Sequence, residues 1–138
     1  MDPEVVAYIR LGQSMGVNEV RAGLAARTSV YVEIERVFRD YDFLVTPTVS
    51  VAAFEIGLTS PSEIDGVKTT SFRDWLPYTY PFNLSGHPAV TIPAGFTSEG
   101  LPVGIQIVGP RFSDREVLAL ARAMESERPW AAKYPPFI

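Results

Sequence analysis

The stretch from Pro81 to Gly109, PFNLSGHPAVTIPAGFTSEGLPVGIQIVG, constrains the fold of this chain more than any other part of the sequence. It contains two apolar runs, residues 89–96 and 101–108, on either side of a short polar segment that ends in Gly100. Two such runs joined by a short glycine-containing segment are typical of a β-hairpin. Because both runs are almost continuously apolar, both faces of the hairpin should be covered by protein. We therefore expect the hairpin inside a sheet with helices on each side, and not at an edge.

Proline and glycine residues interrupt both runs and the turn before them. Proline has no N–H for the strand ladder and glycine has no side chain to pack, so each indicates a strand end, a bulge or a close approach of the backbone to a neighbour. We expect five positions to determine the local shape first and to serve function second. They are Asn83, Gly86, Gly95, Gly104 and Gln106.

The remaining elements follow from hydrophobic periodicity and capping residues. Helices are predicted at about residues 3–11, 18–40 and 113–127, with helix caps at Asp2 and Asn18 and a capping box that starts at Ser113. A short strand is predicted at about residues 42–46. The expected fold class is therefore α/β, with a small mixed sheet of three strands (42–46, 89–96 and 101–108) flanked by helices.

The composition is that of one mildly acidic globular domain. The 138 residues are 46% hydrophobic and carry a net charge of -4. The interspersed, net negative charge disfavours nucleic acid and anionic membranes as partners. The chain has no cysteine, which excludes disulfides and thiolate metal sites. Since neither a signal peptide nor a long apolar helix is recognisable, we expect a cytoplasmic protein.

The ordered motif in residues 81–109 resembles the C-terminal part of the amidase signature hydrolases. The matching positions are Asn83, Gly86, Pro88, Pro93, Gly95, the run from Gly100 to Gly104, Gln106 and Gly109. The segment DFLVTPT (residues 42–48) and the ERPW motif at 127–130 are also similar to that family. The resemblance covers nearly the whole chain but only the last quarter to third of such an enzyme. It implies that residues 1–138 are one partial domain of the amidase signature fold.

The resemblance also implies the chemistry of the parent enzyme. Members hydrolyse carboxamides through an acyl-serine intermediate, without a metal or organic cofactor, using two serines and a lysine from a Gly- and Ser-rich segment further upstream. This chain has no Gly-Gly or Ser-Ser pair, and its two lysines, Lys68 and Lys133, lie in polar or terminal contexts. No catalytic residue is therefore assigned, and we expect the chain alone to be inactive.

Residues 72–80, FRDWLPYTY, are dense in aromatic side chains. They can be explained as a cover over the hairpin, since aromatic rings are usually buried or half-buried, or as the wall of a pocket. By resemblance, the substrate-binding candidates are Trp75, Leu76, Tyr78 and Thr79. Amidotransferase members of the family tend to carry an acidic residue near Leu76, so leucine favours a neutral or apolar amide. The irregular segment before them, residues 47–70, is expected to border a pocket as a lid would.

Two further residues could suggest a different hydrolase. Residues 12–16, GQSMG, fit the G-x-S-x-G pattern with Ser14 as nucleophile, and His87, the single histidine, could be its base. The pattern requires a strand before the serine and a helix after it, whereas a helix is predicted before Ser14. His87 has no acid adjacent in sequence, so a structural role is favoured.

The expected partners follow from the apolar strands. They are a small amide substrate and either the N-terminal catalytic part of an amidase or a second copy of this chain, since unpaired apolar strands associate. An alternative is a non-catalytic binding or assembly module that pairs its sheet with another chain. The tail from Trp130 to Ile138 is expected to lie extended against a neighbour.

Overall fold

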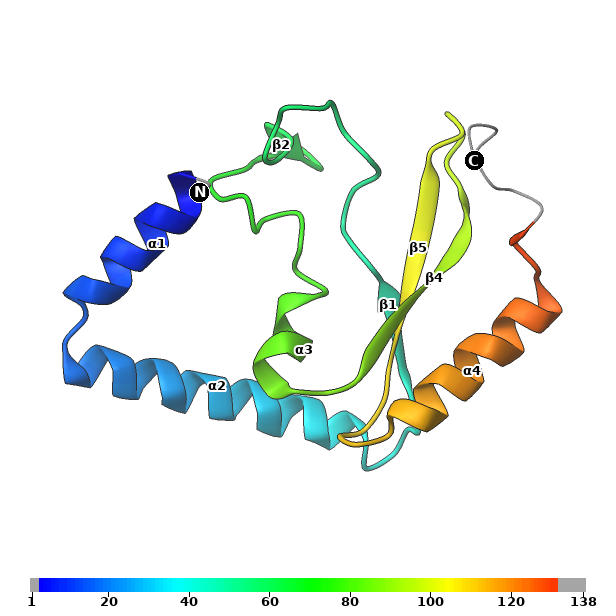
Figure 1. Cartoon of the computed structure of the whole chain (residues 1–138), viewed down its shortest axis with the longest axis horizontal. Coiled ribbons are helices and arrows are strands. Elements are labelled where there is room, and N and C mark those ends of the chain that lie inside the picture. The colour runs from blue at the N-terminus through cyan, green and yellow to red at the C-terminus, as the bar shows by residue number, and fades with distance from the viewer. Residues whose placement is uncertain (1–2, 132–138) are drawn as a thin grey trace.

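A computed structural model describes residues 3–131 of the chain (Figure 1). The described part alternates helices with short strands in the order expected for an α/β protein. The elements are α1 (Pro3–Ser14), α2 (Val17–Val37), β1 (Leu44–Pro47), β2 (Glu63–Ile64), β3 (Val67–Lys68), α3 (Tyr80–Ser85), β4 (Ala89–Phe96), β5 (Pro102–Val108) and α4 (Asp114–Glu127). The expected helix cap at Asp2 and the tail beyond residue 131 lie outside the described residues.

The predicted hairpin is confirmed as β4 and β5, and β1 pairs with the other side of β5. The sheet order is β1-β5-β4, so β5 is the central strand. The register of the hairpin shifts between Pro93 and Gly95, and Gly95 has a φ of 148°, which glycine adopts most readily. The two interrupted positions in the apolar run therefore form the bulge that the sequence indicated.

The expectation of a mixed sheet is wrong for the strands that the structure describes. Both pairings, β1 with β5 and β4 with β5, are antiparallel. A parallel pair would need a crossover connection that places two strands in the same direction. Here β4 and β5 are joined by a tight turn, and β1 runs in the same direction as β4 on the opposite side of β5.

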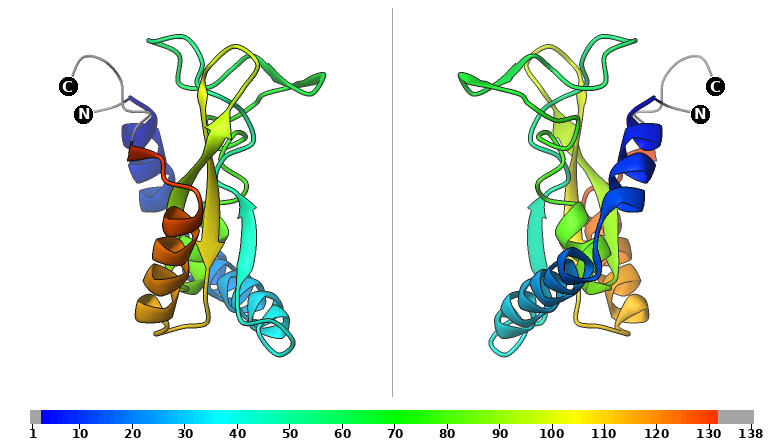
Figure 2. Two further views of the ribbon diagram at one scale, coloured as in Figure 1. Left: turned by 90° about the vertical axis from the view of Figure 1, so that its right-hand side faces the viewer. Right: turned by 90° about the vertical axis from the view of Figure 1, so that its left-hand side faces the viewer.

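One face of the sheet packs against α4 and forms the apolar core (Figure 2). Ile92 and Ile107 contact Val117 and Ala121 of this helix, and all four side chains are buried. Trp130 packs against the same cluster. Because side chains alternate along a strand, the neighbours of Ile107 point to the opposite face, where Gln106 lies between Thr46 and Thr91 of the flanking strands.

The expectation that helices cover both faces of the sheet is confirmed on one face only, where α4 packs. On the face opposite α4, the segment before α3 approaches the sheet, and α3 in turn packs on α2 (Figure 1). Within residues 3–131, β4 has a strand partner on one side only. The expectation that the hairpin is not at an edge is therefore wrong for the described part of the chain, although the apolar character of β4 remains that of a covered strand.

The helix boundaries differ from the predicted ones because of local hydrogen bonds. Helix α1 continues past Gly12 to Ser14, and α2 begins at Val17, after Gly16 instead of Asn18. The Glu19 carboxylate accepts the N–H of Gly16 at 2.7 Å, so the cap is supplied from inside the helix. Ser113 precedes α4 but makes no side-chain cap, because its hydroxyl donates to the carbonyl of Pro110.

Helices α1 and α2 form an arm that extends away from the sheet (Figure 1). No residue of α2 is fully buried, and most of the apolar side chains of this arm are exposed. They are Val5, Tyr8, Ile9, Leu11, Met15, Val17, Val20, Leu24 and Val32. The arm is attached to the rest of the chain near α3, where Arg27 donates to the carbonyl of Leu84 at 2.6 Å.

Three short elements, α3, β2 and β3, were not predicted. Residues 80–85 form α3, which ends where Gly86 adopts a left-handed φ of 74°, so the expected tight turn is a short helix with its C-terminal turn. Within the irregular segment of residues 47–70, β2 and β3 form a small hairpin with two residues in each strand. Its turn is Asp65 and Gly66, both with positive φ. An Asp-Gly pair is a strong hairpin signal, and it could have been recognised in the sequence.

Gly109 offers a direct test of the packing between β5 and α4. A Cβ added at Gly109 would lie 2.6 Å from Cγ2 of the buried Val117. We expect Gly109→Ala to lower the free energy of unfolding by about 1–3 kcal/mol, the usual cost of overpacking a core. The matched control is Gly23→Ala in α2, where nothing lies within 4 Å of the added carbon. Urea unfolding of both variants checks the expectation, which equal stabilities would contradict.

Candidate functional site

The aromatic segment of residues 71–80 crosses the polar face of the sheet, and Trp75 holds its first half. The indole Nε1 donates to the carbonyl of Thr59 at 3.2 Å, and its ring meets Phe54 edge-to-face at 5.3 Å between centroids. The Trp75 carbonyl accepts both the N–H and the hydroxyl of Ser50 at 3.2 Å. Trp75 thus connects the irregular segment of residues 47–70 to the aromatic segment that follows it.

The second half of the segment is attached directly to the central strand. Gln106 donates its side-chain amide to the carbonyl of Tyr78 at 2.7 Å and to the hydroxyl of Thr46 at 3.2 Å. The phenol ring of Tyr78 is partly exposed, while Leu76 and Thr79 are half-buried. The four predicted binding residues therefore lie on one stretch of backbone that is hydrogen-bonded to residues 47–70 at Trp75 and to the sheet at Tyr78.

The two charged residues of the segment are engaged locally. The Asp74 carboxylate accepts the N–H groups of Thr70 and Ser71 at 2.6 and 2.9 Å, and these hydrogen bonds lower the pKa of Asp74. Arg73 donates to the hydroxyl of Tyr8 at 2.8 Å and lies 4.6 Å above that ring. The carboxylate therefore shapes the loop, and the guanidinium connects the segment to α1.

A hollow of about 590 Å³ lies beside the aromatic segment, and its size is within the range of small-molecule sites. It is lined by Ser71, Arg73, Asp74, Pro77, Tyr80 and Leu84. None of the four predicted binding residues is among these six. Two of the six are their direct neighbours in sequence, since Pro77 lies between Leu76 and Tyr78 and Tyr80 follows Thr79. Tyr80 belongs to the predicted aromatic segment but was not among the predicted binding residues, and Tyr8 is related to the segment only by the fold.

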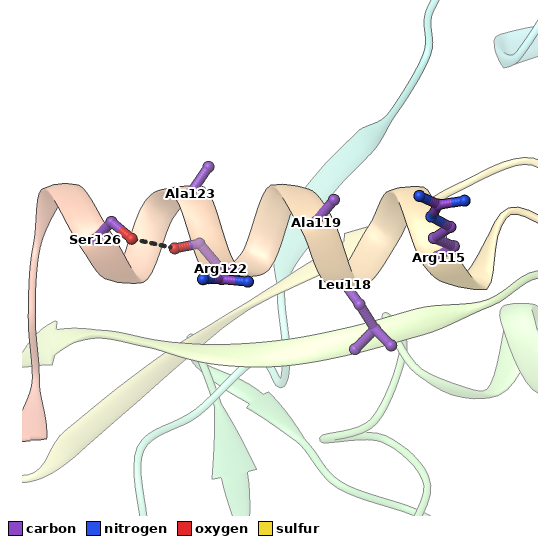
Figure 3. A pocket seen from close by; sticks show the side chains of 6 residues that line it. All are labelled: Arg115, Leu118, Ala119, Arg122, Ala123 and Ser126. Carbon is purple, nitrogen blue, oxygen red and sulfur yellow. Dashed lines mark hydrogen bonds between the residues drawn. The ribbon is translucent and has the colours of Figure 1, made fainter.

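Another hollow, of about 460 Å³, lies on α4 (Figure 3). Its lining residues are Arg115, Leu118, Ala119, Arg122, Ala123 and Ser126, all from that one helix. Helix α4 covers the face of the sheet opposite to Gln106 and the aromatic segment. This hollow is therefore a surface of one helix, away from the residues that carry the candidate site.

His87 is buried at the junction of α2, α3 and the start of β4. Its Nδ1 lies 2.8 Å from the hydroxyl of Ser85 and its Nε2 lies 3.1 Å from a carboxylate oxygen of Glu35. The ring stacks on Tyr31 and on Phe38, with centroids 5.9 and 5.2 Å away. His87 thus has an acid partner after all, from a helix 52 residues away in sequence, which no local pattern could have indicated.

This environment makes His87 a structural residue. Burial is the main cause that lowers its pKa, and the positive charge of Arg111 acts in the same direction, while Glu35 opposes them. Ser14 lies on the exposed end of α1, where its hydroxyl donates to the carbonyl of Leu11 at 2.8 Å. Since both ring nitrogens contact Ser85 and Glu35, His87 is not arranged as a base for Ser14. A helix also precedes Ser14, contrary to the G-x-S-x-G geometry.

Comparison with known proteins agrees with the fold and with the motif on the hairpin. The profile of the Amidase family matches residues 2–118. This sheet-and-helix arrangement thus defines part of an amidase signature fold, and the chain belongs to the amidase signature family.

Individual relatives extend this result. The chain is 45% identical over 97 residues to an acylamidase of Rhodococcus erythropolis, and the match covers 70% of this chain and 20% of that protein. It is 37% identical over 110 residues to a glutamyl-tRNA(Gln) amidotransferase chain of Halothermothrix orenii, covering 79% of this chain and 21% of that protein. A solved bacterial aryl acylamidase superposes with a TM-score of 0.82 and 32% identity, over 96% of this chain and 27% of that one.

The chain thus spans between a fifth and somewhat over a quarter of the length of these relatives. Of the residues that the structure describes, no helix combines the length and apolarity needed to cross a membrane.

His87 predicts a specific pH dependence of stability. Because its pKa is lower in the folded chain than the ordinary value of 6.5, the unfolded chain binds the proton more readily. The free energy of unfolding should therefore be constant above that ordinary value and fall as the pH decreases from it toward the lowered folded pKa. Urea unfolding at several pH values measures this. In His87→Gln, which removes the only imidazole, this part of the pH dependence should vanish, and an unchanged profile would contradict the assignment.

Proposed function

We propose that this chain is the C-terminal part of an amidase, one partial domain that supplies core strands and the wall of a substrate pocket. The parent reaction is hydrolysis of a carboxamide through an acyl-serine intermediate. The observation that carries this proposal is the unequal coverage, since an aryl acylamidase structure matches 96% of this chain but the chain matches 27% of that structure. The serine pair and spaced lysine of the family do not occur in this sequence, so the nucleophile and its base would come from the remaining part.

Two surfaces support a requirement for that remaining part. The eight residues of β4, AVTIPAGF, and the four of β1, LVTP, contain no charge, whereas natural edge strands are usually protected by charged residues. The exposed apolar residues of the α1–α2 arm add a second surface of the kind that is normally buried against protein. We infer that the N-terminal catalytic part of the amidase covers these surfaces.

The substrate that fits the segment best is a neutral or apolar amide. Leu76 occupies the position at which amidotransferase members of the family tend to carry an acid. The nearest carboxylate in sequence, Asp74, already accepts two backbone N–H groups. An ammonium group placed beside Leu76 would lose its hydration without gaining a partner, which is unfavourable in a half-buried site. Trp75, Leu76, Tyr78 and Thr79 would contact the acyl part of such an amide.

A second candidate function is that of a non-catalytic assembly module, and the same uncharged edge strands favour it. In that case β4 would add to the sheet of another chain, or of a second copy, by main-chain hydrogen bonds. The two functions differ in whether an active site is completed when the missing part is supplied.

A chimera tests the proposed function. The C-terminal region of the Rhodococcus acylamidase that matches this chain would be replaced by residues 1–138, and hydrolysis of a neutral acyl nitroanilide would be measured. We expect the chimera to be active and the isolated chain to show only the buffer rate, because nucleophile and base lie in the relative's part. The control is the chimera with that nucleophilic serine replaced by alanine. A folded but inactive chimera would favour the assembly module, and hydrolysis by the isolated chain would overturn both candidates.

Leu76 tests the substrate class. In the active chimera, Leu76→Asp should improve kcat/KM for an anilide with a free α-amino group, relative to its neutral analogue, by about tenfold, the value of one charge-assisted hydrogen bond. The matched control is Leu76→Asn, which has similar size without the charge. Equal preference in the two variants would mean that residue 76 does not face the substrate's α-carbon.

A further inference from the structure

Gln106 is a buried polar side chain at the centre of the sheet, 5% exposed. Both interactions of its amide nitrogen are with groups from other elements, the hydroxyl of Thr46 on β1 and the backbone carbonyl of Tyr78 in the aromatic segment. The second hydrogen bond is the shorter, at 2.7 Å. A buried amide is costly unless its hydrogen bonds are made, so the position of the Tyr78 carbonyl and the burial of Gln106 depend on each other.

Small and hydroxyl-bearing residues surround Gln106 on its face of the sheet. Thr46, Gln106 and Thr91 lie side by side across the three strands. Thr48, which directly follows β1, donates its hydroxyl to the hydroxyl of Thr91 at 3.3 Å. A Cβ on Gly104 would lie 2.9 Å from Cγ2 of Thr91 and 3.0 Å from the Thr48 hydroxyl. Glycine at 104 therefore permits the side chains of Thr48 and Thr91 to approach each other across the central strand.

Besides the side-chain hydrogen bonds of Arg73 to Tyr8 and of Trp75 to Thr59, two backbone carbonyls of the aromatic segment, three residues apart, accept tertiary hydrogen bonds that act as tethers. The carbonyl of Trp75 is held by Ser50, and the carbonyl of Tyr78 is held by Gln106. Residues 76 and 77 lie between these tethers, so the direction of the backbone there is fixed at both ends. Ser50 belongs to the irregular segment of residues 47–70, whereas Gln106 belongs to the central strand β5.

We propose that Gln106 is a positioning residue, which fixes the wall segment of residues 75–79 to the sheet through the Tyr78 carbonyl. The inference rests on the proposed function for the contact with substrate, but the tether itself concerns the chain alone. An amide suits this position because it donates two hydrogen bonds without a charge. A carboxylate at the same place would present acceptors to the carbonyl oxygen, and an apolar side chain would leave that oxygen without its donor.

Hydrogen exchange on the full chain tests the tether. Gln106→Met keeps the length of the side chain and removes the donor. Protection of the Thr79 amide, which donates to the Leu76 carbonyl at 3.2 Å, should fall by about tenfold, the effect of one lost buried hydrogen bond, while protection in β4 and β5 persists. The matched control is Thr46→Val, which removes the other partner of the Gln106 amide and leaves the Tyr78 contact, and it should change the protection of Thr79 much less. Equal effects of the two variants, or no effect of either, would overturn the proposal.

Gln106→Glu separates positioning from general support of the fold. The introduced side chain can donate one hydrogen bond to the Tyr78 carbonyl when it is protonated, whereas the ionised carboxylate cannot. The groups that face this position are the Thr46 and Thr91 hydroxyls and the Tyr78 carbonyl, which do not titrate in the acidic range. The protection factor of the Thr79 amide, corrected for intrinsic exchange, should recover toward wild type as the pH is lowered. Absence of acid recovery, or loss of protection across β4 and β5 in both Gln106 variants, would reduce Gln106 to a folding residue and overturn the proposal.

The active chimera adds a readout on the substrate. Gln106→Met should raise KM for the neutral anilide several-fold with a smaller change in kcat, because binding geometry is lost before the reacting groups are affected. An unchanged KM in an active chimera contradicts the positioning role while leaving the proposed function intact. An inactive chimera contradicts the proposed function, and the exchange results then decide the tether independently.

Discussion

The two faces of β5 differ in chemistry, and the arrangement of the surrounding elements depends on this difference. Ile107 points to α4 and is fully buried in the apolar cluster, while the preceding residue, Gln106, points to the opposite face and binds the aromatic segment. Alternation along one strand thus connects the hydrophobic core to the wall of the candidate site. A shift of one residue in the register would place Gln106 in the apolar cluster, so the packing against α4 also fixes the geometry of the polar face.

The candidate site is built by polar tethers and aromatic contacts more than by a deep apolar core. Trp75 is held by Phe54, Thr59 and Ser50, and Asp74 and Arg73 are both engaged by neighbouring groups. The rings of Tyr78 and Tyr80 are the exposed aromatic side chains of this segment, and Tyr80 lines the hollow beside it. Because Asp74 and Arg73 are engaged locally, the proposed pocket wall favours a neutral group over a charged one.

His87 illustrates how a residue that suggests catalysis can serve structure. An acid, a histidine and a serine lie within hydrogen-bonding distance in the order Glu35, His87, Ser85. Ser85 and His87 are both buried, and the ring is enclosed by Tyr31 and Phe38. A nucleophile must reach its substrate, and the aromatic rings and the short helix α3 occupy the space around this serine. The group therefore joins α2 to the start of β4.

The sequence by itself determined the family, the β4–β5 hairpin, the three main helices and the positions where Gly86, Gly95 and Gly104 shape the backbone. These are local properties, because they depend on periodicity, on residues without a side chain or donor, and on an ordered motif. The partner of the Gly16 N–H is also a local choice, since Glu19 lies three residues along the chain. The tertiary structure alone decided that Glu35 meets His87, that Arg73 meets Tyr8 and that Gln106 holds the Tyr78 carbonyl. These contacts join residues 28–65 positions apart, so no local pattern shows them before the backbone has brought the residues together.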